Sequence, residues 1–235
     1  MTNSQVILNL IEQIPENELI FASKLYKEKL KNQVSEDSFY QTLGRLRKSG
    51  KLSRIAKGTY YRPKISKYGI VPPSEKEIIS AFTESNSGTV IGYTLYNNLK
   101  LTTQLPQKIE VLSSRMDQQT RNISNVLLQF CDLVYTPNIE SMIHMLEVLQ
   151  NFDQIQDLNS RCFIEYCKNF VSTYNDATFK VVNTQKKYQK RTISFLKNIL
   201  EFYNVSNELD RYLSTMSDYK HPTMEEIYET AQLSQ

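Results

Sequence analysis

Basic and amide side chains recur between residues 35 and 64, with types and spacing suited to binding a nucleic acid. If this stretch is helical, Gln41, Arg45 and Lys48 share one polar side. In a major groove, arginine pairs with guanine and glutamine with adenine, and lysine binds phosphates. The stretch is therefore expected to bind double-stranded DNA. The candidate DNA-binding residues are Ser38, Tyr40, Gln41, Arg45, Lys48, Lys51, Arg54 and Lys57.

A helix with a defined start and stop must position the first of these residues. Ser35 can cap its N-terminus, and Gly50 can follow its last turn. Phe39, Leu43 and Leu46 recur at helical spacing, so they form one apolar stripe. Gln41 and Lys48 lie almost opposite this stripe, and Arg45 and Ser38 lie beside them. The pattern predicts one face for a core and one for an anionic partner.

A short hairpin is expected directly after this helix. Tyr60–Tyr61 has strand character, and Lys57–Gly58 suits the turn. Helical signals over 6–14 and 22–30, with a β-prone run at 19–21, precede it. Residues 1–64 are thus predicted to form a winged helix-turn-helix, whose helix enters a major groove and whose hairpin lies near the backbone.

The charge distribution supports this prediction. Residues 35–64 carry eight basic and two acidic side chains, a net charge of +6, whereas the whole chain is +3. Residues 1–34 are neutral, so residues 65–235 sum to −3. Localised positive charge favours phosphate binding that weakens as salt rises. A charge run alone is more often a solvated surface; its coincidence with a helix, a turn and a hairpin favours DNA binding.

The rest of the chain predicts a linker at 65–73 and a second domain at 74–235. Ser74 and Glu77 have the spacing of a capping box. Helices are expected near 91–99 and 139–149, and strands at 108–113, 126–130 and 133–135. Residues 74–150 are thus α+β, and residues 151–235 read as helical. The predicted class is α+β, mostly helical, with a winged helix followed by a mixed and then an all-helical region.

Composition narrows the function classes. No apolar run approaches the roughly 18 residues of a transmembrane helix, and the N-terminus lacks the pattern of a signal peptide, so a cytoplasmic protein with no membrane partner is expected. Cys131, Cys162 and Cys167 lack metal-ligand spacing and are expected to be buried thiols. His144 and His221 are isolated, so neither a metal nor a cofactor is predicted.

Enzymatic signatures are missing from the sequence. A nucleotidyltransferase needs paired aspartates for two metals, and the chain has no Asp-x-Asp. Its six glycines do not form a phosphate loop, and its two histidines suggest no Ser-His-Asp set. The sequence therefore favours a role other than catalysis.

Two alternative functions remain open. Winged helices also bind proteins, so the chain could be an adaptor. It could instead be a transcription regulator whose helices after Leu158 enclose a ligand pocket. Residues 186–191 add a basic run with Tyr188 inside it. This run could contact DNA backbone or RNA, but the junction of two helices explains it better.

Three segments resemble the AbiEi-like antitoxins of type IV toxin–antitoxin systems, which act in abortive phage infection. They are Gly58–Pro63, Tyr68–Glu75, and Gly92–Asn97 with Leu101–Gln104. The resemblance covers roughly residues 1–150 and weakly the helical remainder. It implies that the winged helix binds inverted repeats in its own promoter and represses the operon. It also implies that the protein counteracts a nucleotidyltransferase toxin. The long helical tail after Leu158 departs from the pattern.

Overall fold

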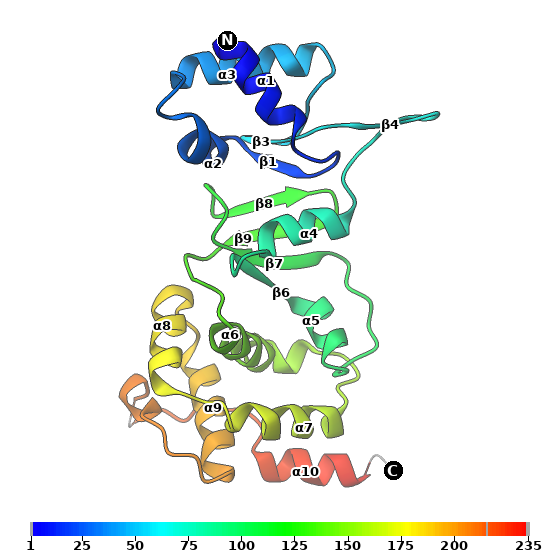
Figure 1. Cartoon of the computed structure of the whole chain (residues 1–235). Coiled ribbons are helices and arrows are strands. Elements are labelled where there is room, and N and C mark those ends of the chain that lie inside the picture. Colours follow the sequence, from blue (N-terminus) through cyan, green and yellow to red (C-terminus); the bar gives the residue numbers. More distant parts are fainter. Residues whose placement is uncertain (1, 215, 234–235) are drawn as a thin grey trace. The chain divides into compact units, whose positions relative to one another are not determined.

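The computed structural model describes residues 2–214 and 216–233, which divide into two compact units. The N-terminal unit is Met1–Ala81, and the C-terminal unit is Phe82–Gln235. The fold is mixed α and β and mostly helical, as predicted (Figure 1). The division lies inside helix α4 (Glu75–Thr83), whereas the sequence predicts a boundary after residue 73. Every helix in the described ranges is too short or too polar to span a lipid bilayer.

The N-terminal unit has the winged helix-turn-helix arrangement that the sequence predicts. Its antiparallel sheet has the order β1-β3-β2, and β2 and β3 form the wing. The turn between them contains Gly58, whose φ of +72° is a conformation that favours glycine. Its elements are α1 (Asn3–Glu12), β1 (Leu19–Phe21), α2 (Ala22–Leu25), the π-helical turn η1 (Tyr26–Leu30), α3 (Glu36–Lys48), β2 (Ser53–Ala56) and β3 (Thr59–Tyr61).

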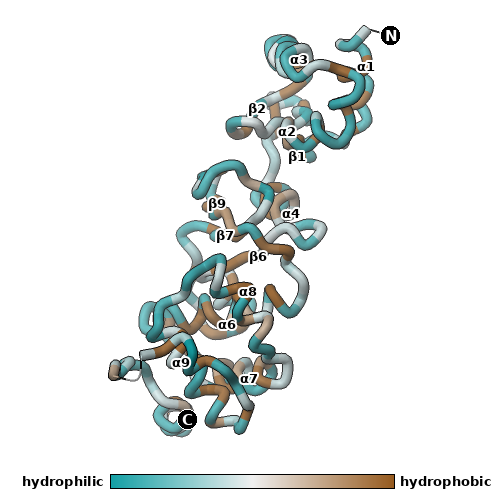
Figure 2. Tube along the Cα trace, turned by 90° about the vertical axis from the view of Figure 1, so that its left-hand side faces the viewer, coloured by the Kyte–Doolittle hydropathy of each residue, from teal (hydrophilic) through white to brown (hydrophobic). Residues whose placement is uncertain are grey.

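Local sequence and burial together explain α3. The Ser35 side chain accepts a hydrogen bond from the Ser38 backbone N–H at 3.4 Å, and Gly50 follows the helix with φ +75°. Phe39, Leu43 and Leu46 are buried with α1 residues in one core cluster. Each fully buried side chain of this size stabilises the fold by about 1.5–3 kcal/mol. The stripe therefore fixes which side of α3 faces solvent; Figure 2 shows how hydrophilic most of this helix is.

Residues 65–73 are not the plain linker that the sequence predicted. Strands β4 (Lys64–Ser66) and β5 (Gly69–Val71) form an antiparallel hairpin in which Ile65 pairs with Ile70. The Ser66 hydroxyl donates to the Gly69 carbonyl at 3.0 Å and closes the turn. Gly69 and the pair Pro72–Pro73 favour a linker, but the β-branched residues Ile65, Ile70 and Val71 favour strands.

The C-terminal unit combines a four-stranded sheet with helices. The strand order is β6-β7-β9-β8, with β7 and β9 parallel and the other pairs antiparallel. Hydrophobic residues colour much of β6 and β7 brown in Figure 2. Its elements are β6 (Gly88–Ile91), α5 (Gly92–Asn98), β7 (Ile109–Ser113), β8 (Thr120–Ile123), β9 (Val126–Phe130), α6 (Pro137–Gln150), η2 (Phe152–Gln154), α7 (Ser160–Val171), α8 (Asp176–Lys186), α9 (Lys190–Phe202), η3 (Leu209–Tyr212) and α10 (Met224–Leu233).

In the C-terminal unit, two strands differ from the prediction by their presence and one by its absence. β6 and β8 were missed, and residues 133–135 are irregular, although Leu133 and Tyr135 are buried. β6 begins at Gly88, where a Cβ atom would lie 2.4 Å from the carbonyl oxygens of Leu112 and Phe82. Close backbone approach, which no local pattern encodes, selects glycine there.

Helix α6 is the centre of the helical core. Most of its residues from Met142 to Leu149 are buried, and it belongs to one hydrophobic cluster with α7–α10. Cys131 and Cys167 are buried thiols as expected, and Cys162 is half-buried. The predicted capping box is confirmed, because Ser74 exchanges hydrogen bonds with Glu77. Thr223 and Glu226 form the same arrangement before α10.

Candidate nucleic-acid interface and a polar cavity

The outer side of α3 presents the side chains proposed to read base edges. Gln41, Arg45 and Lys48 are all exposed, opposite the buried stripe. Ser38 is half-buried, and its carbonyl accepts a hydrogen bond from the Thr42 hydroxyl at 2.8 Å. The structure thus brings the first three together on one accessible face and leaves Ser38 at its N-terminal edge.

Tyr40 lies on the flank of α3 rather than at its centre. Its ring is 39% exposed and packs edge-on against Phe39, with centroids 5.2 Å apart. The phenol is accessible to the backbone of a bound DNA. It does not lie on the side of α3 that carries Gln41 and Arg45.

The remaining candidates lie on the wing and the turn before it. Lys57 is exposed in the β2–β3 turn. Arg54 is exposed, and its Nε donates to the Ala56 carbonyl at 3.2 Å. The Lys51 Nζ lies 3.4 Å from the Glu12 carboxylate, a pair that the sequence did not suggest. An exposed pair of this kind is worth at most about 1 kcal/mol, so a phosphate can compete for Lys51.

Arg62 contributes to the local positive charge but has a structural role. Its Nη1 donates to the Glu12 carbonyl at 2.8 Å and to the Ile14 carbonyl. These carbonyls lie at the C-terminal end of α1, where the helix dipole favours a cation. The charge of Arg62 therefore holds α1 against the wing.

Gly44 lies in the interior of α3, close to the exposed basic residues. A Cβ atom built on it would meet nothing within 4 Å, so packing does not require a glycine. At helical spacing it lies between Gln41 and Lys48. A helix-interior glycine costs about 1 kcal/mol relative to alanine. Gly44 therefore leaves open space beside Gln41 and Lys48, where a side chain could stand.

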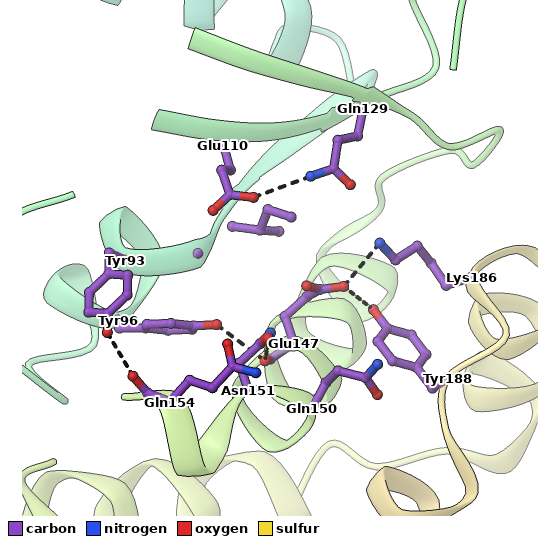
Figure 3. Close-up of a pocket in the computed structure, with 12 residues that line it drawn as sticks. Tyr93, Tyr96, Glu110, Gln129, Glu147, Gln150, Asn151, Gln154, Lys186 and Tyr188 are labelled. Carbon is purple, nitrogen blue, oxygen red and sulfur yellow. Dashed lines mark hydrogen bonds and ion pairs between the residues drawn. The ribbon is translucent and has the colours of Figure 1, made fainter. Parts of the chain in front are cut away.

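The C-terminal unit contains a polar cavity of about 350 Å³ (Figure 3). It lies against the sheet residues Glu110 and Gln129, with α5, α6 and α8 supplying other walls. Its lining residues are Ile91, Gly92, Tyr93, Tyr96, Glu110, Gln129, Glu147, Gln150, Asn151, Gln154, Lys186 and Tyr188. These residues are spread over nearly a hundred positions of the chain, so no local sequence motif predicts that they meet.

Glu147 is the most buried carboxylate of the cavity, at 7% exposure, and its Oε1 has two partners. The Lys186 Nζ lies 3.1 Å from its Oε1, and the Tyr188 hydroxyl donates to the same oxygen at 2.7 Å. Burial, together with the adjacent Glu147 charge, raises the pKa of the Tyr188 hydroxyl and keeps it a donor. Lysine and tyrosine thus compensate the buried charge, as a buried carboxylate requires.

Glu110 differs from Glu147 in its partners. Its Oε2 accepts a hydrogen bond from the Gln129 amide at 3.2 Å. Burial raises the pKa of the Glu110 carboxyl, and the Glu147 charge raises it further. A Cβ atom on Gly92 would lie 2.6 Å from Glu110 Oε1, so a larger residue here would displace the carboxylate, and the φ of +64° also favours glycine.

The basic run at 186–191 lies at the junction of two helices, which is the interpretation that the sequence favours over a nucleic-acid contact. α8 ends at Lys186 and α9 begins at Lys190. Lys186 pairs with Glu147 inside the cavity, and Arg191 bonds to Asp153 and to the Lys220 carbonyl. The two basic residues at its ends therefore have partners within the protein.

The histidines have partners of their own. The His144 Nε2 lies 2.7 Å from the Thr89 hydroxyl, and burial lowers the pKa of His144 despite the nearby Glu140 carboxylate. His221 stacks on Phe195 with centroids 4.9 Å apart. Within the part of the chain that the structure describes, no three His, Cys, Asp or Glu side chains are grouped to hold a metal ion.

A comparison with protein families found one match. The model of a family of unknown function, DUF6088, matches residues 7–130, which is just over half of the chain. The match includes most of the winged helix and the sheet of the C-terminal unit, with Glu110 and Gln129, and stops before α6. No curated protein matched the chain.

Proposed function

We propose that this chain, which belongs to the DUF6088 family of unknown function, is a sequence-specific DNA-binding transcription regulator. The observation that carries the proposal is the outer face of α3 in a winged helix, where Gln41, Arg45 and Lys48 are exposed together opposite the buried stripe. Gln41 and Arg45 contact base edges, and Lys48, Lys51, Arg54 and Lys57 contact phosphates. The protein is not an enzyme in this proposal and acts in the cytoplasm.

The regulated DNA is proposed to be the inverted repeats upstream of the protein's own gene. The support is the resemblance to AbiEi-like antitoxins at Gly58–Pro63 and Tyr68–Glu75. The same resemblance supports an antitoxin role against a nucleotidyltransferase toxin. This second part has a separate test. Growth arrest by a nucleotidyltransferase encoded beside this gene should be relieved by co-expression of the full chain. Continued arrest with the chain present would remove the antitoxin role and leave DNA binding unaffected.

The DNA-binding test is a gel shift with the upstream fragment and a scrambled fragment of equal composition, each at two salt concentrations. Selective binding that weakens as salt rises is expected. Arg45→Ala should reduce specific affinity by about 1–3 kcal/mol. Arg47→Ala is the matched control, because it removes the same charge from the flank of α3. Equal binding to both fragments, or equal loss in both variants, would refute base readout by this face.

A further inference from the structure

We propose that the cavity of the C-terminal unit is a binding site for a small organic cation, an ammonium or guanidinium compound, held by the Glu110 carboxylate. The proposal concerns only this unit and does not depend on DNA binding by α3. It assigns a ligand class to a site whose walls come from β7, β9, α5, α6 and α8.

The charges of the cavity set the sign of the ligand. Glu110, Glu147 and Lys186 line it, so one negative charge exceeds the positive charge. Lys186 neutralises Glu147, with 3.1 Å between Nζ and Oε1. Within the described ranges, no lysine, arginine or histidine forms an ion pair with Glu110. A monocation restores neutrality, whereas an anion would face the Glu110 charge.

The setting of Glu110 distinguishes it from a solvated surface carboxylate. Gln129 holds its Oε2, and the backbone of Gly92 lies against its Oε1. Removing a carboxylate from water without a cation is unfavourable, and burial does raise its pKa. A cationic ligand would supply the missing countercharge at a place that the fold keeps fixed.

Aromatic rings complete the match to a cation. Tyr93 and Tyr96 line the cavity, with ring centroids 5.5 Å apart and planes at 62°. Their hydroxyls donate to the Gln154 and Glu147 carbonyls at 2.7 and 3.3 Å, which fixes the rings. Cations bind favourably over the faces of such rings. A volume of about 350 Å³ is at the small end of ligand cavities, which favours a compact amine.

The test is isothermal titration calorimetry of the full chain with n-butylamine and with n-butylguanidine, each of which carries one positive charge at neutral pH. 1-Butanol serves as the neutral analogue and butyrate as the anionic one. Saturable binding is expected for at least one of the two cations and for neither analogue. No saturable binding of either cation at millimolar concentration would overturn the proposal.

Variants tie the signal to the cavity. Glu110→Gln keeps the shape and the bond to Gln129 and should weaken cation binding at least tenfold. Glu165→Gln, at an exposed site on α7, is the matched control and should bind as wild type does. Tyr93→Leu should weaken binding more than Tyr93→Phe, which keeps the ring. Equal affinity in Glu110→Gln and wild type would refute the site. These titrations contain no DNA, so their outcome tests the cavity alone and leaves the DNA-binding proposal to the gel shift.

Discussion

The two units present polar groups to a partner in opposite ways. On α3 and the wing of the N-terminal unit, exposed side chains from one continuous stretch, 35–64, point into solvent with few partners in the protein. In the cavity of the C-terminal unit, polar groups from distant segments bond to one another, and among the described residues Glu110 forms no ion pair, whereas Glu147 pairs with Lys186. An exposed charged face suits a long polyanion, whereas a cavity with one unpaired carboxylate suits one small ligand.

This difference has an energetic consequence for substitutions. Exposed basic residues contribute little to stability, because water solvates them in both the folded and unfolded states. A buried pair such as Glu147 and Lys186 has exchanged its hydration for a fixed partner. Substitutions on α3 should therefore alter binding with little change in folding, and substitutions in the cavity should alter folding as well.

The largest expected effect is that of Lys186→Met, which leaves the Glu147 carboxylate buried without its cation. We expect the free energy of unfolding of the C-terminal unit to fall by about 3–5 kcal/mol. Urea unfolding followed by circular dichroism measures it. Lys180→Met, at an exposed position of the same helix, is the control and should be nearly neutral. Equal small effects in both would show that the Glu147–Lys186 pair is solvated.

A smaller effect, on binding alone, is expected for Lys57→Ala at the tip of the wing. Loss of one phosphate contact should weaken all sequences alike and reduce the slope of log affinity against log salt by about 1. Gel shifts at several salt concentrations measure the slope. Lys180→Ala removes an exposed charge from the C-terminal unit and should leave the slope unchanged. A Lys57→Ala slope equal to wild type would remove the wing from the interface.

Gly44→Ala should separate folding from binding on α3. Its new methyl group meets nothing within 4 Å, so the free energy of unfolding should rise by about 1 kcal/mol. Gly44→Gln adds a long side chain at the same open position and should weaken DNA binding. Thermal unfolding and the gel shift measure the two effects. DNA affinity unchanged in Gly44→Gln would mean that this part of α3 does not approach DNA.

The smallest expected effect is the stability change of Glu110→Gln, which depends on pH. Since folding raises the pKa of this carboxyl, the folded state favours its protonated form. The protonated Glu110 carboxyl stabilises the fold fully below the pKa that it has in the unfolded chain. This stabilisation is lost as pH rises through the pKa that it has in the folded protein. The glutamine variant should therefore match wild type near pH 4 and exceed its melting temperature slightly at pH 7.5. A lower melting temperature at pH 7.5 would show that the Glu110 charge is already compensated.

Much of the N-terminal unit could be predicted because its signals are local. The cap at Ser35, the stripe Phe39, Leu43 and Leu46, and the turn glycine Gly58 lie close together in sequence. The hairpin at 64–71 does not follow from the local pattern, because prolines flank it on both sides and Gly69 lies within it. The sequence shows that Lys51 and Arg62 are positively charged but does not show what they contact. Their partner on α1, Glu12, is about forty or more residues away, beyond the range of any periodicity.

The sequence by itself determined the winged helix, the exposed basic side of α3 and the helical character of the tail, because helix periodicity and capping depend on neighbours a few residues apart. Only the tertiary structure decided that Glu110, Glu147 and Lys186 share one cavity. Strand pairing between β7 and β9 and the packing of α6 bring them together. Such long-range contacts arise from the burial of the whole unit, and no spacing along the chain records them.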